Sequence, residues 1–436
     1  MQNTLLTLTD WLSYIEKLHS KPIDLGLERM TEMIRRLGIH FTCPVFTVAG
    51  TNGKGSTCAF IERILREAGY RTAMHTSPHL MRFNERALLD GREIEDEPLI
   101  RAFREIEEAR AGMPLTYFEF TGLAVLRCFQ EAQPDAVILE IGLGGRLDAM
   151  NAIDPDVSVV AAVGIDHTAF LGDTREAIGL EKAHIFRSGR PAVCSDPEPP
   201  QSLIDYAHEI GAKLALINRD FHIAEKDDGT FLFSMRGKAL KLPKPGLAGE
   251  NQYRNAAGAL AAVFELKERL PVAPEAVARG IAEARITARF ERVTDRPCET
   301  ILDVGHNPQA AEVLAENLRR SKRPGERTLA VFGMLSDKDR AKVTKTLAPE
   351  IDEWFYAGLP GPRGGAAAAL EPFLRDAGVA SSAMTASDRV ADALQKARSR
   401  AVALQGEGIP PRIIVFGSFV TVGEALECLA SEGVRR

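Results

Sequence analysis

One stretch decides the fold of this chain: Val45-Phe-Thr-Val-Ala-Gly-Thr-Asn-Gly-Lys-Gly-Ser-Thr57. Its first five residues are apolar or β-branched, which is typical of a buried strand, and a glycine-rich turn follows at once. A helical pattern then runs from Ser56 to Ala68, with Gly69 as its expected C-cap. This order predicts a phosphate-binding cradle, because backbone N–H groups and the positive end of the helix face the anion.

The cradle predicts a nucleoside triphosphate as ligand. The residues expected to contact it are Gly53, Lys54, Gly55, Ser56 and Thr57. The lysine would reach the outer phosphates, and one of the two hydroxyls would bind Mg²⁺. The spacing departs from the common phosphate loop, since only two residues separate Gly50 from Gly53 and a glycine follows the lysine. The alternative is a glycine-rich turn that only joins a strand to a helix.

Length and composition limit the class of protein. A chain of 436 residues is expected to form two or three domains. The formal charge of −6 gives no general attraction to nucleic acid or to a membrane, and no apolar run has membrane-spanning length. Six scattered cysteines without a Cys-x-x-Cys pair argue against a disulfide framework or a zinc site. They favour a reducing, cytoplasmic location.

Strand-like and helical segments alternate along most of the chain, which predicts an α/β fold. We expect an N-terminal doubly wound parallel sheet of the P-loop type and a smaller C-terminal Rossmann-like domain. Alternation and turn dipeptides indicate a small antiparallel excursion at about 221–249, and the stretch 283–297 is expected to be a linker. The predicted domains are 1–288, which would bind the triphosphate, and 289–436.

Several chemically capable residues stand near the expected ends of strands. Glu140 ends an apolar strand and suits Mg²⁺; the alternative is a surface acid at a strand end. His167 is expected to close another strand, as a metal ligand or as a structural residue. Lys182 is expected at a helix start and has no evident role by itself. Asp303 and His306 share a turn after the first strand of the second domain, at the ligand-facing edge.

A set of short strings occurs in the order found in one family. The strings are Ile23-Asp-Leu-Gly-Leu27, Gly50–Ser56, Ser77-Pro-His-Leu80, Asn84-Glu-Arg86, Tyr117-Phe-Glu119, Glu140-Ile-Gly-Leu-Gly-Gly-Arg-Leu-Asp148, Asp166-His-Thr168, Glu181-Lys182, Gln252–Asn255, Arg289-Phe-Glu291 and Asp303–Pro308. Together they make the chain resemble the folylpolyglutamate synthases, including the bacterial bifunctional dihydrofolate synthase/folylpolyglutamate synthases, within the Mur-ligase-like group. Each string is weak alone, but the ordered set is specific.

The resemblance implies an enzyme that joins L-glutamate to dihydropteroate and to reduced folates, using ATP and an acyl-phosphate intermediate. It implies two Mg²⁺ sites, K⁺ as a further candidate, and a carbamylated Lys182. The implied metal ligands are Ser56, Ser77, Glu140 and His167, and the implied ATP contacts outside the loop are Asn255, Arg289 and Asp303. Lys54, His167, Lys182 and His306 are the implied catalytic residues. Glutamate would bind in the second domain.

The implied pteroate-binding and glutamate-binding residues fall into short segments. They are Asp24, Leu25, Gly26, Leu27, Thr116, Tyr117, Phe118, Glu119, Leu147, Asp148, Ala149 and Ser418. The chain departs from the family pattern at Met150, Ala169 and His184, which puts details of loop shape in question. None of these departures removes a phosphate or metal ligand.

Two other functions fit parts of the pattern. Another Mur-like amino-acid ligase would share the phosphate loop and Lys182, but not the segments near Asp24 and Tyr117. A non-catalytic nucleotide switch would need neither Lys182 nor the turn that begins at Asp303. The expected partners are small-molecule substrates only, with no nucleic acid and no membrane, and a monomer is the expected state.

Overall fold

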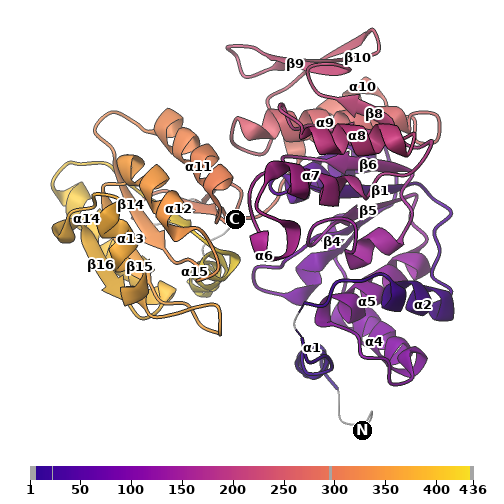
Figure 1. Cartoon of the computed structure of the whole chain (residues 1–436). Coiled ribbons are helices and arrows are strands. Elements are labelled where there is room, and N and C mark those ends of the chain that lie inside the picture. Colours follow the sequence, from indigo (N-terminus) through magenta and orange to yellow (C-terminus); the bar gives the residue numbers. More distant parts are fainter. Residues whose placement is uncertain (1–5, 22, 294–296, 433–436) are drawn as a thin grey trace. The chain divides into compact units, whose positions relative to one another are not determined.

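The two halves of the chain form separate α/β units in the computed structural model (Figure 1). The structure describes residues 6–21, 23–293 and 297–432. The N-terminal unit comprises the chain up to Gly246 together with Gln252–Arg285, and the C-terminal unit comprises Leu247–Asn251 and the chain from Ile286 onward. The α/β class expected from the sequence is confirmed in both units.

The N-terminal unit contains an eight-stranded sheet in the order β4-β3-β2-β5-β1-β6-β7-β8. Its strands are β1 Val45–Ala49, β2 Thr72–His75, β3 Ala87–Leu89, β4 Arg92–Glu93, β5 Ala136–Glu140, β6 Val157–Val160, β7 Pro191–Cys194 and β8 Lys213–Leu216. Six strands are parallel, whereas β3 and β4 form an antiparallel edge. Val48 of β1 pairs with Glu140 and with Val159, so the loops after three neighbouring strands meet at one edge.

Ten helices belong to this unit among the residues that the structure describes. They are α1 Leu8–Ile15, α2 Glu28–Leu37, α3 Lys54–Glu67, α4 Asp96–Arg110, α5 Tyr117–Ala132, α6 Thr168–Leu171, α7 Arg175–Ala183, α8 Gln201–Glu209, α9 Asn251–Glu265, whose first residue belongs to the C-terminal unit, and α10 Pro274–Glu283. The first two helices pack with α4 and α5 around the fully buried rings of Trp11, Phe103 and Phe120. This apolar contact holds the N-terminal segment against the rest of the unit.

The antiparallel excursion expected at 221–249 is confirmed. It is a three-stranded sheet of β9 Phe221–Glu225, β10 Phe231–Met235 and β11 Lys238–Leu242, in the order β11-β10-β9. Arg236 and Gly237 both have positive φ, 48° and 74°, which matches the tight two-residue turn that the twist of a hairpin favours. Tyr253 of α9 donates its hydroxyl to the carbonyl of Gly229 at 2.9 Å, which ties this sheet to α9.

The C-terminal unit contains a six-stranded sheet in the order β12-β13-β17-β14-β15-β16. The strands are β12 Glu291–Val293, β13 Thr300–Asp303, β14 Arg327–Phe332, β15 Glu353–Ala357, β16 Met384–Ser387 and β17 Pro411–Phe416. The helices are α11 Pro308–Ser321, α12 Arg340–Leu347, α13 Glu371–Asp376, α14 Val390–Gly406 and α15 Phe419–Ser431. All strands but β12 are parallel, as expected for a Rossmann-like sheet.

The linker expected at 283–297 is wrong in part, because Glu291–Val293 forms β12 and pairs antiparallel with β13. A three-residue edge strand is too short to produce a readable alternation of side chains. Residues 294–296 of the expected linker lie outside the described part of the chain.

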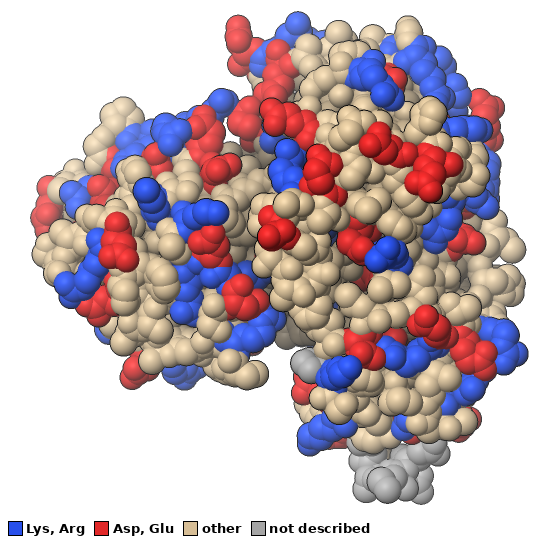
Figure 2. Space-filling view, in the orientation of Figure 1, with Lys and Arg blue, Asp and Glu red and all other residues tan. Residues whose placement is uncertain are grey.

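The surface and the thiols agree with the composition. Basic and acidic side chains are interspersed on the face shown in Figure 2. All six cysteines lie in described residues and are free thiols. No helix in the described ranges is long and apolar enough to cross a membrane.

Candidate active site

The phosphate loop turns directly into α3. Gly53 has a φ of 85°, a conformation that side chains rarely adopt, and its carbonyl accepts hydrogen bonds from the backbone N–H and the hydroxyl of Thr57, both at 2.9 Å. The helix starts at Lys54, two residues earlier than expected. The Lys54 ammonium donates to the carbonyl oxygens of Gly50 and Thr51 at 3.1 and 3.3 Å. The loop therefore folds around its own lysine.

Asn255 lies against this loop from α9. A Cβ atom at Gly53 would collide with the Asn255 side-chain oxygen, so glycine is required there for space as well as for φ. Asn255 is buried, and its amide donates to Gln252 at 2.9 Å. The structure thus brings together two predicted nucleotide-binding residues that are about 200 positions apart.

Glu140 and Ser77 meet at the ends of neighbouring parallel strands. The backbone N–H of Ser77 donates to the buried Glu140 carboxylate at 3.1 Å. Ser56, on α3, is also buried. In residues 6–21, 23–293 and 297–432, no group of three or more His, Cys, Asp or Glu side chains could hold a metal ion. The oxygen-rich predicted set suits Mg²⁺, with phosphate or water completing the shell.

His167 does not close a strand, so that expectation is wrong. β6 ends at Val160, which pairs with the last residue of β1, Ala49. Beyond it, regular pairing with β1 gives way to an isolated antiparallel bridge between Asn52 of the phosphate loop and Ala162. His167 instead precedes α6 in a left-handed conformation, with a φ of 52°. The apolar run after Val160 hid this change from sequence reasoning.

Lys182 does not start a helix either. It lies in the last turn of α7, whose N-terminus is capped by the Thr174 hydroxyl, which accepts from Ala177 N–H at 3.1 Å. The charged pair Glu181-Lys182 resembles a first turn, but the cap lies a full two turns earlier. Lys182 is therefore at the end of its helix, where it is buried beside the loop that follows β5.

The electrostatics around Lys182 differ from those of a surface lysine. Burial, together with the charge of Lys54, lowers the pKa of Lys182 to about 7, against the opposing pull of Asp166 and Asp148. Burial raises the pKa of Asp148 to about 6, although its carboxylate accepts from Leu143 N–H at 2.8 Å. A sizeable fraction of the Lys182 amine is therefore neutral and nucleophilic near neutral pH.

Gly145 allows the loop after β5 to touch α7. A Cβ atom there would collide with the Glu181 carbonyl and lie 2.9 Å from the Lys182 Cα. The next N–H, of Arg146, donates to the same Glu181 carbonyl at 3.0 Å. This close backbone approach places the loop that carries Asp148 next to the helix that carries Lys182.

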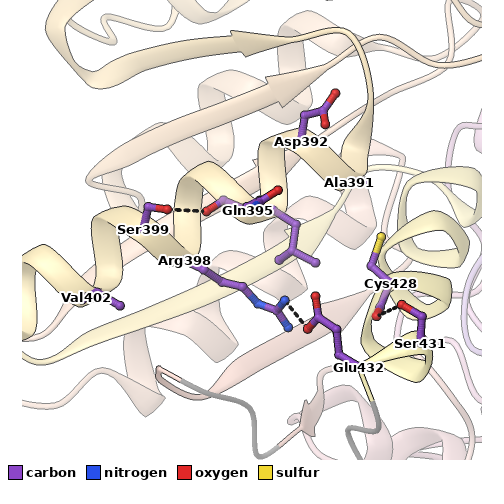
Figure 3. A pocket seen from close by; sticks show the side chains of 10 residues that line it. Ala391, Asp392, Gln395, Arg398, Ser399, Val402, Cys428, Ser431 and Glu432 are labelled. Atoms are coloured by element: carbon purple, nitrogen blue, oxygen red, sulfur yellow. Dashed lines mark hydrogen bonds and ion pairs between the residues drawn. The ribbon is translucent and has the colours of Figure 1, made fainter.

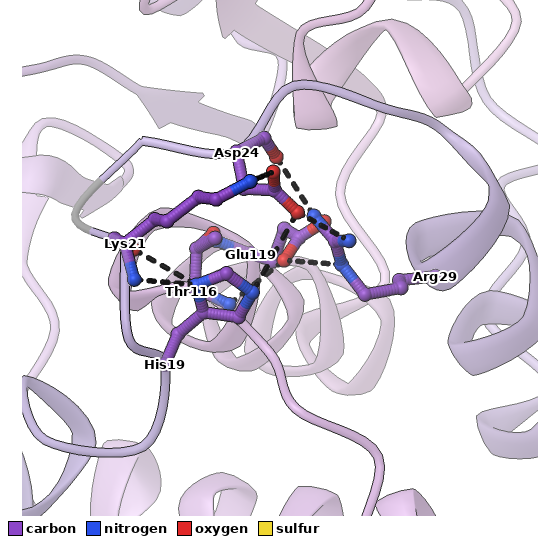
Figure 4. Close-up of polar contacts among 6 residues, drawn as sticks. All are labelled: His19, Lys21, Asp24, Arg29, Thr116 and Glu119. Carbon is purple, nitrogen blue, oxygen red and sulfur yellow. Dashed lines mark hydrogen bonds and ion pairs between the residues drawn. The ribbon is translucent and has the colours of Figure 1, made fainter.

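Two predicted pteroate segments are joined by an arginine (Figure 4). Arg29 donates from Nε to Glu119 at 3.0 Å and from Nη1 to Asp24 at 2.8 Å. Glu119 also accepts from Thr116 N–H at 2.8 Å, while the Thr116 hydroxyl accepts from Glu119 N–H at 3.2 Å and caps α5. Sequence reasoning missed Arg29 as the bridge, although the Thr-x-x-Glu pattern was visible.

The third pteroate segment packs against the second. A Cβ atom on Gly142 would lie 2.7 Å from the Phe118 ring and 3.3 Å from the Asp148 carboxylate. Leu25 of the first segment, by contrast, is 37% exposed. Phe118, Gly142 and Asp148 thus form one contact beside the sheet edge.

The departures from the family pattern have local explanations at two of three positions. The Met150 methyl fills the space above Gly122 on α5. The His184 ring stacks on Tyr206 with centroids 4.2 Å apart. Ala169 is exposed on α6, and nothing in the structure explains it.

The predicted residues of the C-terminal unit gather at the ends of β13 and β17, which pair in parallel. Asp303 accepts from Gly305 N–H at 2.7 Å and from Phe290 N–H at 2.9 Å. Burial raises the pKa of Asp303, and these two backbone donors oppose the rise. The acid therefore holds the turn that carries His306.

Phe419 is the centre of this second group, and sequence reasoning missed it. The Arg289 guanidinium lies 5.3 Å from its ring centroid, and the His306 ring lies 6.1 Å away. Ser418 precedes Phe419 and caps α15 by accepting from Thr421 N–H at 3.0 Å. Only the folded chain shows that this aromatic ring gathers residues from three separate segments.

A groove between α14 and α15 lies elsewhere in the C-terminal unit (Figure 3). An ion pair of 2.6 Å between Arg398 and Glu432 crosses it. Among the described residues, those that line it include no predicted site residue. The two strand edges, and not this groove, carry the candidate chemistry.

Comparison with known proteins first defines the class. Residues 48–263 match the Mur ligase middle domain, and residues 288–419 match the Mur ligase glutamate ligase domain. The first range contains the phosphate loop and Lys182, and the second contains the turn that begins at Asp303. The chain is therefore an ATP-dependent ligase of the Mur type.

Individual relatives then define the family. The dihydrofolate synthase/folylpolyglutamate synthase of Escherichia coli K12 is 44% identical over 97% of this chain and 95% of its own length. A solved structure of E. coli FolC with DHPP and ADP has a TM-score of 0.90 at 42% identity, covering 98% of this chain and 99% of that one. A bifunctional enzyme of this name with Mn, AMPPNP and L-glutamate bound has a TM-score of 0.87 at 39% identity, covering 98% of each chain. The chain belongs to the dihydrofolate synthase/folylpolyglutamate synthase family.

Proposed function

We propose that this chain catalyses both reactions of its family: ATP-dependent addition of L-glutamate to dihydropteroate and to the tail of reduced folates. One observation carries the proposal. The charge of Lys54 acts on Lys182 and on Asp148, so the phosphate loop, the buried lysine and the third pteroate segment share one electrostatic site. That is the arrangement needed to bring a substrate carboxylate to a triphosphate.

The proposed reaction activates a poor electrophile. A substrate carboxylate oxygen attacks the γ-phosphorus of ATP, the bond to the β–γ bridging oxygen breaks, and an acyl phosphate and ADP form. The glutamate amine then attacks the acyl carbon, loses a proton, and phosphate leaves. Lys54 would exchange its carbonyl acceptors in the loop for phosphate oxygens and offset their charge. Exclusion of water would protect the acyl phosphate.

Two Mg²⁺ ions would bind near the first sheet edge, where Ser77 and Glu140 meet. Ser56, Ser77, Glu140 and His167 would hold them, and Mg²⁺ when bound supplies charge neutralisation to the phosphates. The Mn and AMPPNP bound in the related enzyme support a divalent metal beside the nucleotide. K⁺ remains a further candidate to which no residue is assigned.

Lys182 would carry a carbamate. The ammonium would first lose one proton; the neutral amine would then attack CO₂, form an N–C bond and release a second proton. The two steps together replace a cation by an anion near the proposed metal ligands. The pKa of about 7 that burial and Lys54 produce supports this reaction near neutral pH. Asp166 and Asp148, whose charges act on Lys182, line the same environment.

The remaining predicted roles follow the division of the chain. Residues 1–288 would hold ATP and the pteroyl substrate through the segments at Asp24–Leu27, Thr116–Glu119 and Leu147–Ala149. Residues 289–436 would hold glutamate near His306 and Ser418. Arg289 and Asp303, together with Asn255 of the first domain, would contact ATP. We further propose a cytoplasmic monomer whose partners are small molecules, without nucleic acid or membrane.

The direct test is incorporation of labelled glutamate, run separately with dihydropteroate and with a reduced folate monoglutamate. ATP-dependent incorporation with both supports the bifunctional proposal. Incorporation with folate alone removes the first reaction. ATP hydrolysis that depends on a different acid and amino acid, without either folate reaction, would assign the chain to another Mur-type ligation.

A further inference from the structure

Arg86 is held in an unusual way at the end of a 3₁₀ turn, Phe83–Arg86, directly before β3. Its carbonyl accepts from the His75 ring at 2.9 Å and from Thr76 N–H at 3.1 Å. Its guanidinium lies 5.7 Å from the ring centroids of both Phe83 and Tyr117. Backbone and side chain are therefore both fixed before any ligand arrives.

The guanidinium uses one of its five N–H donors for a neutral partner. Nε donates to His79 Nδ1 at 2.8 Å, which requires that this nitrogen carry no proton. Only the other ring nitrogen can then carry a proton, so the imidazole in this hydrogen bond is neutral. His79 therefore orients the guanidinium without neutralising it.

The described residues provide Arg86 with no ion pair. Its nearest acids are engaged elsewhere: Glu85 accepts from Leu80 N–H at 2.7 Å and from Met81 N–H at 2.8 Å, and Glu140 accepts from Ser77 N–H. A largely desolvated cation without an opposite charge is costly. Burial accordingly lowers the pKa of Arg86, although a guanidinium remains charged.

Two other arginines of the molecule have their charge paired by protein groups. Arg412 is 1% exposed, donates to Thr328, Ser321 and Leu318, and lies 3.5 Å from the Glu326 carboxylate. In the N-terminal unit, Arg29 pairs with two carboxylates. The two Nη groups of Arg86 have no protein hydrogen bond in the part of the chain that the structure describes, which indicates a place for an anion.

The surroundings of Arg86 indicate which anion. Tyr117, whose ring lies beside the guanidinium, begins α5 and belongs to a predicted pteroate segment. The charge of Arg86 also interacts with Glu140, beside the phosphate loop. Arg86 directly precedes β3. Three strand spacings separate β3 from β1, so Arg86 lies roughly 14 Å across the sheet from the triphosphate cradle. We propose that Arg86 binds the reacting carboxylate of the pteroyl or folyl substrate through both Nη groups and aligns it for phosphorylation.

The inference rests on the proposed function, because its ligand is the acid that the enzyme would phosphorylate. A planar guanidinium can hold both carboxylate oxygens at once, which a lysine cannot do. His79 acts as a positioning residue, because its Nδ1 accepts from Arg86 Nε and fixes the orientation of the guanidinium plane. His75 fixes the backbone from behind, with its second ring nitrogen buried and unpartnered.

The test compares two ligands with two proteins by calorimetry: pteroic acid and its carboxamide, with wild type and Arg86→Gln. We expect wild type to bind the acid at least about tenfold more tightly than the carboxamide, and Arg86→Gln to reduce this ratio to about threefold or less. Arg82→Gln is the matched control, because Arg82 lies on the same turn, its side chain is 61% exposed, and it faces Glu93 and Asp96. It should keep the wild-type ratio.

A wild-type ratio near one, or a ratio unchanged in Arg86→Gln, would overturn the proposal. Arg86→Lys supplies a second test if the glutamine variant does not fold, and steady-state kinetics should show a KM raised for the pteroyl acid and unchanged for ATP. A KM raised for ATP alone would assign the guanidinium to the nucleotide and overturn it. Glutamate incorporation by wild type is measured separately, so failure of the proposed ligation is distinguishable from loss of acid recognition.

Discussion

Each of the two units has buried charged side chains near the ends of its parallel strands, but their surroundings differ. In the N-terminal unit, burial moves the pKa of Lys182 to about 7 and that of Asp148 to about 6, and the charge of Lys54 acts on both groups. In the C-terminal unit, Asp303 is held by two backbone N–H groups, and Arg289 lies over the Phe419 ring. The difference teaches that a strand-end acid alone says little; its neighbours decide whether it reacts or holds shape.

The strongest challenge to this comparison is removal of Lys54. Lys54→Ala should lower kcat by about 10³-fold, because phosphate charge would no longer be offset, while the melting temperature stays within a few degrees. Lys213→Ala, at an exposed position on β8, should remain near wild type. Near-normal turnover and ATP affinity in Lys54→Ala would break the assignment of the first edge to charge chemistry.

A second challenge targets the buried lysine. Lys182→Ala should lose roughly 10²-fold or more in activity, and added formate or acetate should restore part of it by supplying the missing anion. Full activity without any additive would show that no carbamate is needed at this position.

The pH dependence sharpens the same point. Since burial and Lys54 hold the pKa of Lys182 near 7, the amine is protonated and unreactive below that pH and neutral above it. Protein freed of carbamate should therefore react with CO₂ faster as pH rises through about 7. Mass spectrometry under bicarbonate, or reactivation kinetics, would measure this; a midpoint near 10 would contradict the low pKa.

The second edge should respond more mildly. Asp303→Asn retains one acceptor oxygen but places an amide against an N–H donor, so the turn before His306 should loosen. We expect about tenfold lower kcat/KM for glutamate. Asp337→Asn, whose carboxylate pairs with Arg363 at 2.8 Å on the surface, serves as the control. A loss as large as that of Lys54→Ala would erase the contrast between the edges.

The smallest effect is expected at the arginine bridge. Glu119→Gln weakens the link to Arg29 and the hydrogen bond that the Glu119 side chain accepts from Thr116 N–H at the start of α5, which should lower the free energy of unfolding by about 1–2 kcal/mol. Glu131→Gln, in an exposed pair with Arg101, should change it by less than about 0.5 kcal/mol. Urea denaturation measures both; equal values would mean that Glu119 contributes no more than a surface ion pair.

The local sequence pattern was enough to predict the buried parallel strands, which recur in both units. The strand before Gly50, the strand that ends at Glu140 and the strand that ends at Asp303 were all predictable, because buried parallel strands are continuous apolar runs. The Lys182 helix position and the His167 turn were not, because the helix cap and the end of pairing depend on neighbours.

The site shows the same limit more sharply. Sequence strings could point to Asp24 and Glu119, but the bridge between them comes from Arg29, 90 positions away from Glu119. His79 and Arg86 lie in strings that carry the resemblance but received no role, and Phe419 was missed altogether, because rings and guanidinium groups gain a role only through contacts between distant segments. Motifs locate the reactive groups, whereas packing reveals what orients them.

The turn between β10 and β11 has a practical use. Gly237 has no neighbour within 4 Å of where a Cβ would lie, and both turn residues already have the conformation of a tight reversal. Loop tips of this kind tolerate added chain. A fluorescent peptide tag inserted between Arg236 and Gly237 would sit on the same small sheet that Tyr253 ties to α9. Its emission would then test whether nucleotide binding changes the surroundings of this sheet, without altering any residue of either sheet edge.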